Sequence, residues 1–145
     1  MSENSPLFIS SMELMAHAID LYTEGNAKKY KFVILHLANA VELILKDKVI
    51  DIGQSIYKDN NKLTINIWEC FKSLESQGVS VPERPVIELL IDDRNTIQHR
   101  FGFPNSESVY FYLKSILGFF QRFLQDEYSI NMAEVLLLHT SEENL

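Results

Sequence analysis

The stretch 92–102, Asp-Asp-Arg-Asn-Thr-Ile-Gln-His-Arg-Phe-Gly, sets polar side chains with useful chemistry into an otherwise apolar helical segment. Arg94 keeps its charge at all relevant pH values and can hold a phosphate group with two donors. His99 can take up or release a proton near neutral pH. Asn95 lies four residues before His99, so the two side chains lie on one face of a helix. Arg94, Asn95 and His99 are therefore the candidate site residues.

The apolar residues before this stretch predict a buried helix that ends just after His99. Val86, Leu90 and Ile91 recur at helical spacing, and Gly102 with Pro104 is a typical helix stop. His99 then lies in the last turn, where the negative end of the helix dipole favours the imidazolium form. This position favours the role of proton donor for His99.

Helical geometry separates the two main candidates. At about 100° per residue, Arg94 lies inside the apolar stripe, while Asn95 and His99 share another face. Arg94 and His99 are about 140° apart on an ideal helix. They converge only if the arginine reaches round the helix, or if the same helix of a second copy completes the site.

The segment from Arg94 to His99 resembles the Arg-x4-6-His signature of the HEPN (higher eukaryotes and prokaryotes nucleotide-binding) domains. Its place on the penultimate long helix of a small helical chain fits the same family. The resemblance implies a metal-independent endoribonuclease, acting as the toxin of a toxin–antitoxin pair or in phage defence. It also implies a homodimer whose cleft holds Arg94 and His99, an RNA substrate and an antitoxin protein as a partner.

In the reaction so implied, a base removes the proton of the 2′-hydroxyl group and an acid protonates the leaving 5′-oxygen. A cation stabilises the charge on the phosphorane. Carried over to this chain, His99 transfers protons, Arg94 stabilises the phosphate, and Asn95 orients His99 or the substrate. Arg100 either adds a contact to the RNA backbone or is an ordinary surface charge.

The alternative is a non-catalytic nucleotide-binding or protein-interaction module, in which Arg94 and His99 form a structural polar network.

One branch of the family carries, two residues after the motif histidine, a tyrosine that accepts adenylate. This chain has Phe101 there, which cannot be adenylylated.

Composition predicts one soluble domain over residues 1–145. The chain is 46% hydrophobic, which suffices for a full core, and has no apolar run long enough to span a bilayer. Its one cysteine, Cys70, indicates a reducing compartment, so we expect a cytoplasmic protein. The net charge of −7 excludes binding to nucleic acid by overall charge, so any RNA contact must be local. His36 and Glu42 lack a third ligand at suitable spacing, and we expect no metal and no cofactor. Glu42 and Lys46 are four residues apart and should form a helix-stabilising contact at the surface.

The expected fold is all-α: an up-and-down bundle of four long helices plus a short additional helix. Apolar periodicity places helices near 8–22, 27–50, 67–74, 86–101 and 109–124, with a further short apolar segment at 130–138. The helix at 27–50 is apolar over most of its circumference, so it should be central. The segment 51–63 should be a surface connector, and Trp68 should pack in the core. The helix at 109–124 is apolar on more than one face, which indicates a homodimer partner.

Overall fold

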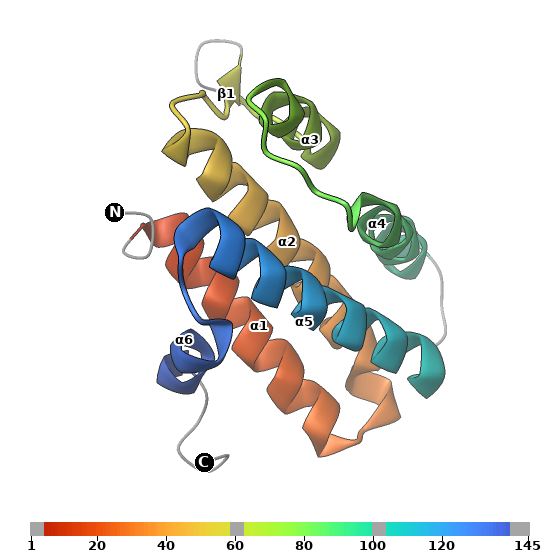
Figure 1. Ribbon diagram of the computed structural model, residues 1–145. Coiled ribbons are helices and arrows are strands. Elements are labelled where there is room, and N and C mark those ends of the chain that lie inside the picture. The colour runs from red at the N-terminus through yellow and green to blue at the C-terminus, as the bar shows by residue number, and fades with distance from the viewer. Residues whose placement is uncertain (1–4, 59–62, 100–103, 140–145) are drawn as a thin grey trace.

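The computed structural model describes residues 5–58, 63–99 and 104–139 and is mainly helical (Figure 1). The elements in chain order are α1 (Pro6–Glu24), the 3-10 turn η2 (Ala27–Lys29), α2 (Tyr30–Asp51), β1 (Tyr57–Lys58), β2 (Leu63–Thr64), α3 (Ile67–Ser76), α4 (Arg84–His99), α5 (Ser106–Tyr128) and α6 (Met132–His139). The all-α prediction is confirmed. Two of the α-helices, α3 and α6, are short, and the predicted connector 51–63 contributes to a small antiparallel hairpin in which Tyr57 pairs with Thr64.

Local sequence signals fix the ends of several helices. Ser5 caps α1 by accepting a hydrogen bond from the Phe8 amide at 3.1 Å, and Asn105 caps α5 by accepting one from Ser108 at 2.8 Å. Asn66 and Glu69 bond reciprocally at the start of α3, as a capping box does. Each cap pairs one or two of the free amide groups at its helix start, so α1, α3 and α5 begin where their caps lie.

The core is built around α2, which packs against α1, α3, α4 and α5. This confirms the prediction that it is the central helix. α1 and α2 run in opposite directions, because the Ser11 hydroxyl donates to the Ala40 carbonyl at 2.7 Å and His17 lies beside His36. α5 also runs opposite to α1. The helices α1, α2 and α5 lie side by side in Figure 1, whereas α4 is seen nearly end-on and crosses them.

Two predictions about individual side chains are wrong. Trp68 stacks on Phe71 at 6.2 Å but is 38% exposed, so it lies at the edge of the core. Lys46 pairs with Glu42 at 2.8 Å, which was expected to be a surface contact, yet the lysine side chain is only 10% exposed. Its ammonium group also donates to the Thr64 hydroxyl at 3.0 Å and so ties the hairpin to α2.

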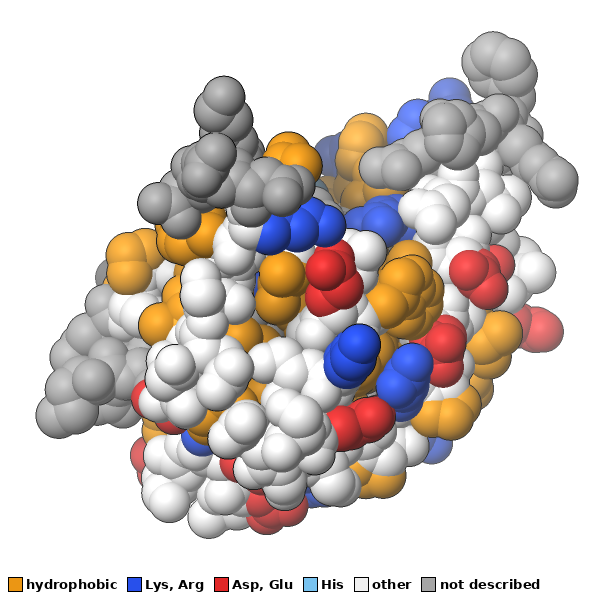
Figure 2. All heavy atoms as spheres, turned by 90° about the horizontal axis from the view of Figure 1, so that it is seen from above, with side chains coloured by type: hydrophobic (Ala, Val, Ile, Leu, Met, Phe, Trp, Pro, Cys, Tyr) orange, Lys and Arg blue, Asp and Glu red, His pale blue; other side chains and the backbone are white. Residues whose placement is uncertain are grey.

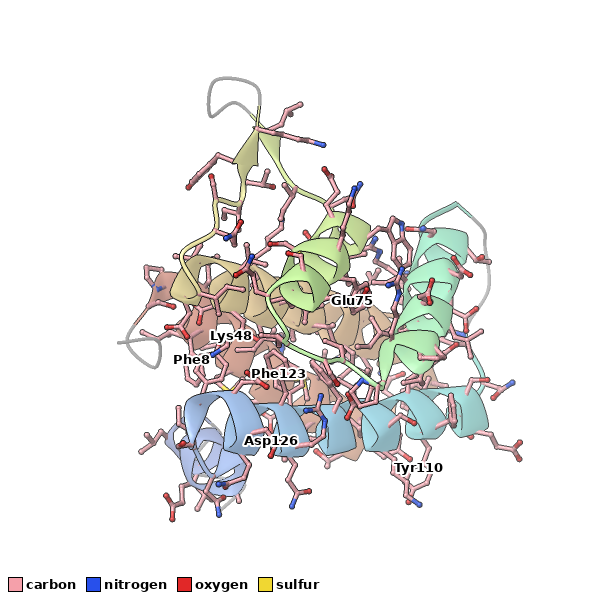
Figure 3. The ribbon with its side chains drawn as sticks, turned by 45° about the horizontal axis from the view of Figure 1, so that its top comes forward. Phe8, Lys48, Glu75, Tyr110, Phe123 and Asp126 are labelled. Atoms are coloured by element: carbon pink, nitrogen blue, oxygen red, sulfur yellow. The ribbon has the colours of Figure 1, made fainter. Side chains whose placement is uncertain are left out.

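A buried polar cluster joins the start of α1 and the ends of α2 and α5. The Asp47 carboxylate accepts hydrogen bonds from the Ser5 hydroxyl and from the Tyr128 hydroxyl, the latter at 2.8 Å. The Lys48 ammonium donates to the Glu127 carbonyl at 2.8 Å and lies over the Tyr128 ring. In Figure 3, Phe8, Lys48 and Phe123 gather at this end, and Tyr110 lies toward the other end of α5. The cluster satisfies its own buried polar groups, and the Phe8 and Phe123 rings pack against Tyr128, so polar and aromatic contacts together hold the three helices.

We expect Asp47→Asn to change how stability depends on pH. Burial raises the pKa of Asp47 above its ordinary value of 3.8, against the opposing effect of the hydrogen bonds from Ser5 and Tyr128. The folded state therefore holds this proton more tightly than the unfolded chain does. The contribution of Asp47 to the free energy of unfolding is largest below pH 3.8 and is lost as the pH rises through the folded pKa.

Urea unfolding at a series of pH values from 3 upward measures this effect. Relative to wild type, Asp47→Asn should gain stability as the pH rises, because asparagine carries no charge to bury. Glu13→Gln, at an exposed position on α1, is the matched control and should keep the wild-type profile. Parallel curves for wild type and Asp47→Asn would contradict the assignment.

Candidate site at the end of helix α4

Two charged contacts position the first half of α4. The Arg84 guanidinium bonds to Glu75 of α3 at 3.0 Å, lies 3.5 Å from Glu88 and covers the Phe71 ring at 4.8 Å. Just before α4, the Glu83 carboxylate accepts two hydrogen bonds from Arg122 of α5, at 2.6 and 2.7 Å. α4 is thus held between α3 and α5 at its start.

A third contact holds the second half of α4 against α5. The Tyr112 hydroxyl donates to the Asp93 carboxylate, and the Tyr112 side chain is buried. Burial is the largest cause that raises the pKa of Tyr112, followed by the hydrogen bond to Asp93. Tyr112 is therefore a neutral donor throughout the physiological pH range.

Arg94 lies half-buried one residue after Asp93. Its Nε and Nη2 atoms both donate to the Asn95 Oδ1 atom at 3.3 Å. Within the described residues Arg94 makes no ion pair, whereas Arg84 and Arg122 each pair with carboxylates. Arg94 thus presents a charge whose only described side-chain partner is a neutral carboxamide.

The direction of the Arg94 side chain bears on the predicted angular mismatch with His99. Asn95 lies about 100° from Arg94 round the helix, and His99 lies four residues beyond Asn95 on the same face. The guanidinium group has therefore turned from the apolar stripe toward the Asn95 face. This is the first of the two routes to convergence that helical geometry allows. His99 ends α4, but its side chain lies outside the described residues, as do Arg100 and Phe101.

Two further cations that have no ion pair with a described residue lie at the same end of the molecule. Tyr22 is close to both Tyr30 and Tyr110, which brings together the starts of α2 and α5. Lys28 and Lys31, near the start of α2, make no ion pair with any described residue, although Lys31 lies over the Phe32 ring at 5.2 Å. On the face that is seen from above in Figure 2, acidic, basic and apolar side chains are interspersed. Local positive charge is therefore available near the candidate site despite the net charge of −7.

The described residues offer little else that suits chemistry. They contain no group of three or more histidine, cysteine, aspartate or glutamate side chains that could hold a metal ion. The His17 and His36 rings lie 4.6 Å apart and are tilted by 30°, and burial together with His17 lowers the pKa of His36. Cys70 is buried, and burial raises its pKa to about 12, so the thiol is no nucleophile at neutral pH.

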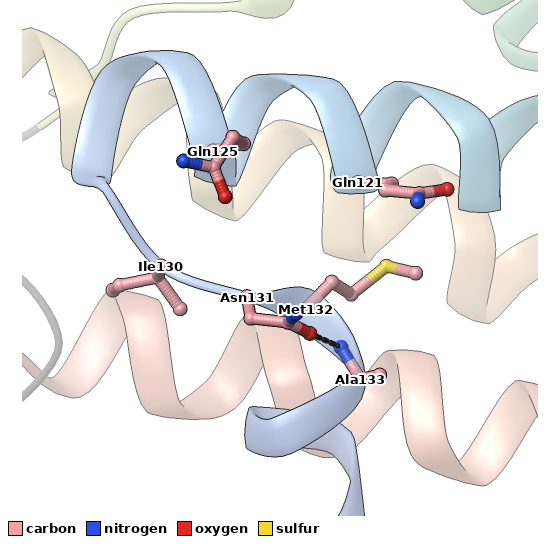
Figure 4. Close-up of a pocket in the computed structure, with 6 residues that line it drawn as sticks. All are labelled: Gln121, Gln125, Ile130, Asn131, Met132 and Ala133. Atoms are coloured by element: carbon pink, nitrogen blue, oxygen red, sulfur yellow. Dashed lines mark hydrogen bonds between the residues drawn. The ribbon is translucent and has the colours of Figure 1, made fainter.

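A pocket of about 360 Å³ lies between α5 and α6, away from α4 (Figure 4). Its walls include Gln121, Gln125, Asn131 and Met132. The Asn131 carboxamide oxygen accepts a hydrogen bond from the Ala133 amide at 2.9 Å and so caps α6. None of these lining residues is charged or titratable, so the pocket does not supply a catalytic group.

Sequence reasoning found Arg94 and Asn95, which the structure brings into contact, but it missed Tyr112 and Asp93 as a pair. Apolar periodicity places Tyr112 within the helix expected at 109–124 but gives it no partner. The useful signal was Asp93 itself, an acidic residue beside the apolar stripe that requires a partner if it faces a neighbouring helix.

The fold and the site define a small all-α domain whose penultimate long helix ends in a polar motif. Residues 6–139 match a family described as a domain of unknown function (DUF3644), and the chain belongs to this family. Comparison with curated proteins and with solved structures gives no match. Within the described ranges, each helix is too short or too polar to cross a membrane.

Proposed function

We propose that this protein is a HEPN-like, metal-independent endoribonuclease whose site is formed by Arg94, Asn95 and His99. The observation that carries the proposal is the direction of Arg94: its guanidinium group has no ion pair with a described residue and lies toward the face that Asn95 shares with His99. An unpaired guanidinium is suited to a phosphate group, because it can donate two parallel hydrogen bonds to phosphate oxygens.

The roles follow from the chemistry of each side chain. Arg94 stabilises the negative charge that develops on the phosphorane when the 2′-oxygen attacks phosphorus. His99 donates a proton to the leaving 5′-oxygen, and a second group removes the proton of the 2′-hydroxyl. The products are a 2′,3′-cyclic phosphate and a 5′-hydroxyl end. In a homodimer, His99 of the second copy is the candidate for that second group.

The wider setting is part of the same proposal. The protein is cytoplasmic, acts as the toxin of a toxin–antitoxin pair or in phage defence, and is restrained by an antitoxin protein. The four-helix up-and-down arrangement also belongs here. The contacts of Glu83 with Arg122 and of Asp93 with Tyr112 support it, because they give α4 and α5 opposite directions. Because α4 crosses the other helices steeply, the arrangement of helices differs from that of a regular bundle.

Induced expression of wild type, Arg94→Ala and His99→Ala, with RNA integrity measured in the same cultures, tests the proposal. We expect growth arrest and RNA cleavage with wild type alone, while all three proteins fold and dimerise alike. If all three leave both cells and RNA intact, and remain harmless to RNA as purified dimers, the enzymatic proposal fails. If the variants lose dimerisation, Arg94 and His99 are structural, as in a non-catalytic binding module.

A further inference from the structure

Arg94 has an acidic neighbour in the chain, Asp93, and a neutral polar neighbour, Asn95, and the two are held by different contacts. Asp93 and Asn95 lie on opposite sides of Arg94, each about 100° away round the helix. The Asp93 carboxylate is bonded to the Tyr112 hydroxyl, whereas the Asn95 carboxamide is bonded to Arg94. The arginine therefore lies with its neutral neighbour and away from its charged one.

Electrostatic attraction alone would favour the opposite arrangement, in which Arg94 pairs with Asp93. An arginine side chain is long and flexible enough to reach either neighbour, and a carboxylate attracts it more strongly than a carboxamide does. Asp93 is exposed, so burial does not keep it from Arg94. The contact that holds Asp93 on the side of α5 is the hydrogen bond from the buried Tyr112.

We infer that Tyr112 is a positioning residue for the candidate site: by holding Asp93 against α5, it leaves Arg94 free for an external phosphate group. This inference rests on the proposed function for the identity of the ligand, an RNA phosphate. Without the Tyr112 hydroxyl, Asp93 competes with the ligand for Arg94. The competition is electrostatic, so it vanishes when the charge of Asp93 is removed.

A double-mutant cycle on RNA affinity tests the inference. The probe is a 2′-O-methyl oligoribonucleotide, which lacks the attacking hydroxyl and cannot be cleaved. Tyr112→Phe should weaken binding by up to about fivefold, the range of an exposed ion pair. Asp93→Asn should bind like wild type, and the double variant should regain wild-type affinity. Tyr110→Phe, an exposed position on the same helix, is the matched control and should change nothing.

Two results of this cycle overturn the inference. If the double variant binds as weakly as Tyr112→Phe, the tyrosine acts through packing and not through Asp93. If Tyr112→Phe binds like wild type, the hydroxyl does not influence Arg94.

The NMR resonance of the Arg94 Nε–Hε group, measured in the same proteins without RNA, separates this inference from the proposed function. We expect that resonance to shift in Tyr112→Phe and to return toward its wild-type position in the double variant. If the resonance behaves in this way but wild type does not bind RNA, the positioning role of Tyr112 is supported and the ribonuclease proposal is overturned. An identical resonance in all four proteins overturns the positioning role even if RNA binds.

Discussion

Purified His99→Ala should cleave RNA about 10²- to 10⁴-fold more slowly than wild type, the usual cost of losing a positioned proton-transfer group. A chelator such as EDTA should leave the wild-type rate unchanged, because the proposed chemistry uses arginine and histidine alone. The wild-type rate should follow a bell-shaped pH profile. His99→Ala should lose the limb at which the proton donor titrates and, because His99 of the second copy is the candidate base, the limb of the base as well. Single-turnover cleavage of a labelled RNA across the pH range measures both effects.

His17→Ala provides a matched control for this comparison. His17 is an exposed histidine on α1 that lies beside His36, so the substitution removes the same group from a different surface. It should retain the wild-type rate and pH profile. Equal rates for wild type and His99→Ala, with both proteins folded, would place the proton transfer on another residue and contradict the assigned role.

Much of the fold could be predicted because it depends on local sequence. Apolar residues at helical spacing locate the helices, and Ser5, Asn66 and Asn105 mark three helix starts by their capping chemistry. The central place of α2 also followed from its own composition. In each case the physical cause lies within one or two helical turns of the residue concerned.

The failures concern side chains whose environment is set by distant parts of the chain. Lys46 was expected at the surface, because a pair four residues apart on a helix is usually exposed. The hairpin instead brings Thr64 over it. Trp68 was expected in the core, yet its ring stacks on Phe71 and stays 38% exposed. Neither outcome follows from apolar periodicity, which predicts the buried face of a helix but not the residues that cover that face.

In the candidate site, too, some features follow from local sequence and others depend on distant residues. Spacing along one helix predicted that Arg94 and His99 are misaligned and that Asn95 shares the face of His99. It left open whether the arginine reaches round the helix or relies on a second copy. The structure shows the turn toward Asn95, and the contact that accounts for it, Tyr112 with Asp93, joins residues 19 positions apart. A constraint from α5 thus sets the direction of a side chain on α4.

Phe119→Ala should lower the free energy of unfolding by about 3–5 kcal/mol, the usual cost of removing a fully buried ring and leaving a cavity. Phe119 is fully buried, and its ring packs at 5.3 Å from Phe120 and 5.1 Å from Phe123. Phe111→Ala makes the same change on the same helix at a side chain that is 49% exposed, so the loss should be under about 1 kcal/mol. Urea unfolding of the three proteins measures the difference. Equal losses for the two variants would mean that burial of the ring does not set the cost of its removal, and would contradict the role of Phe119 as a core anchor of α5.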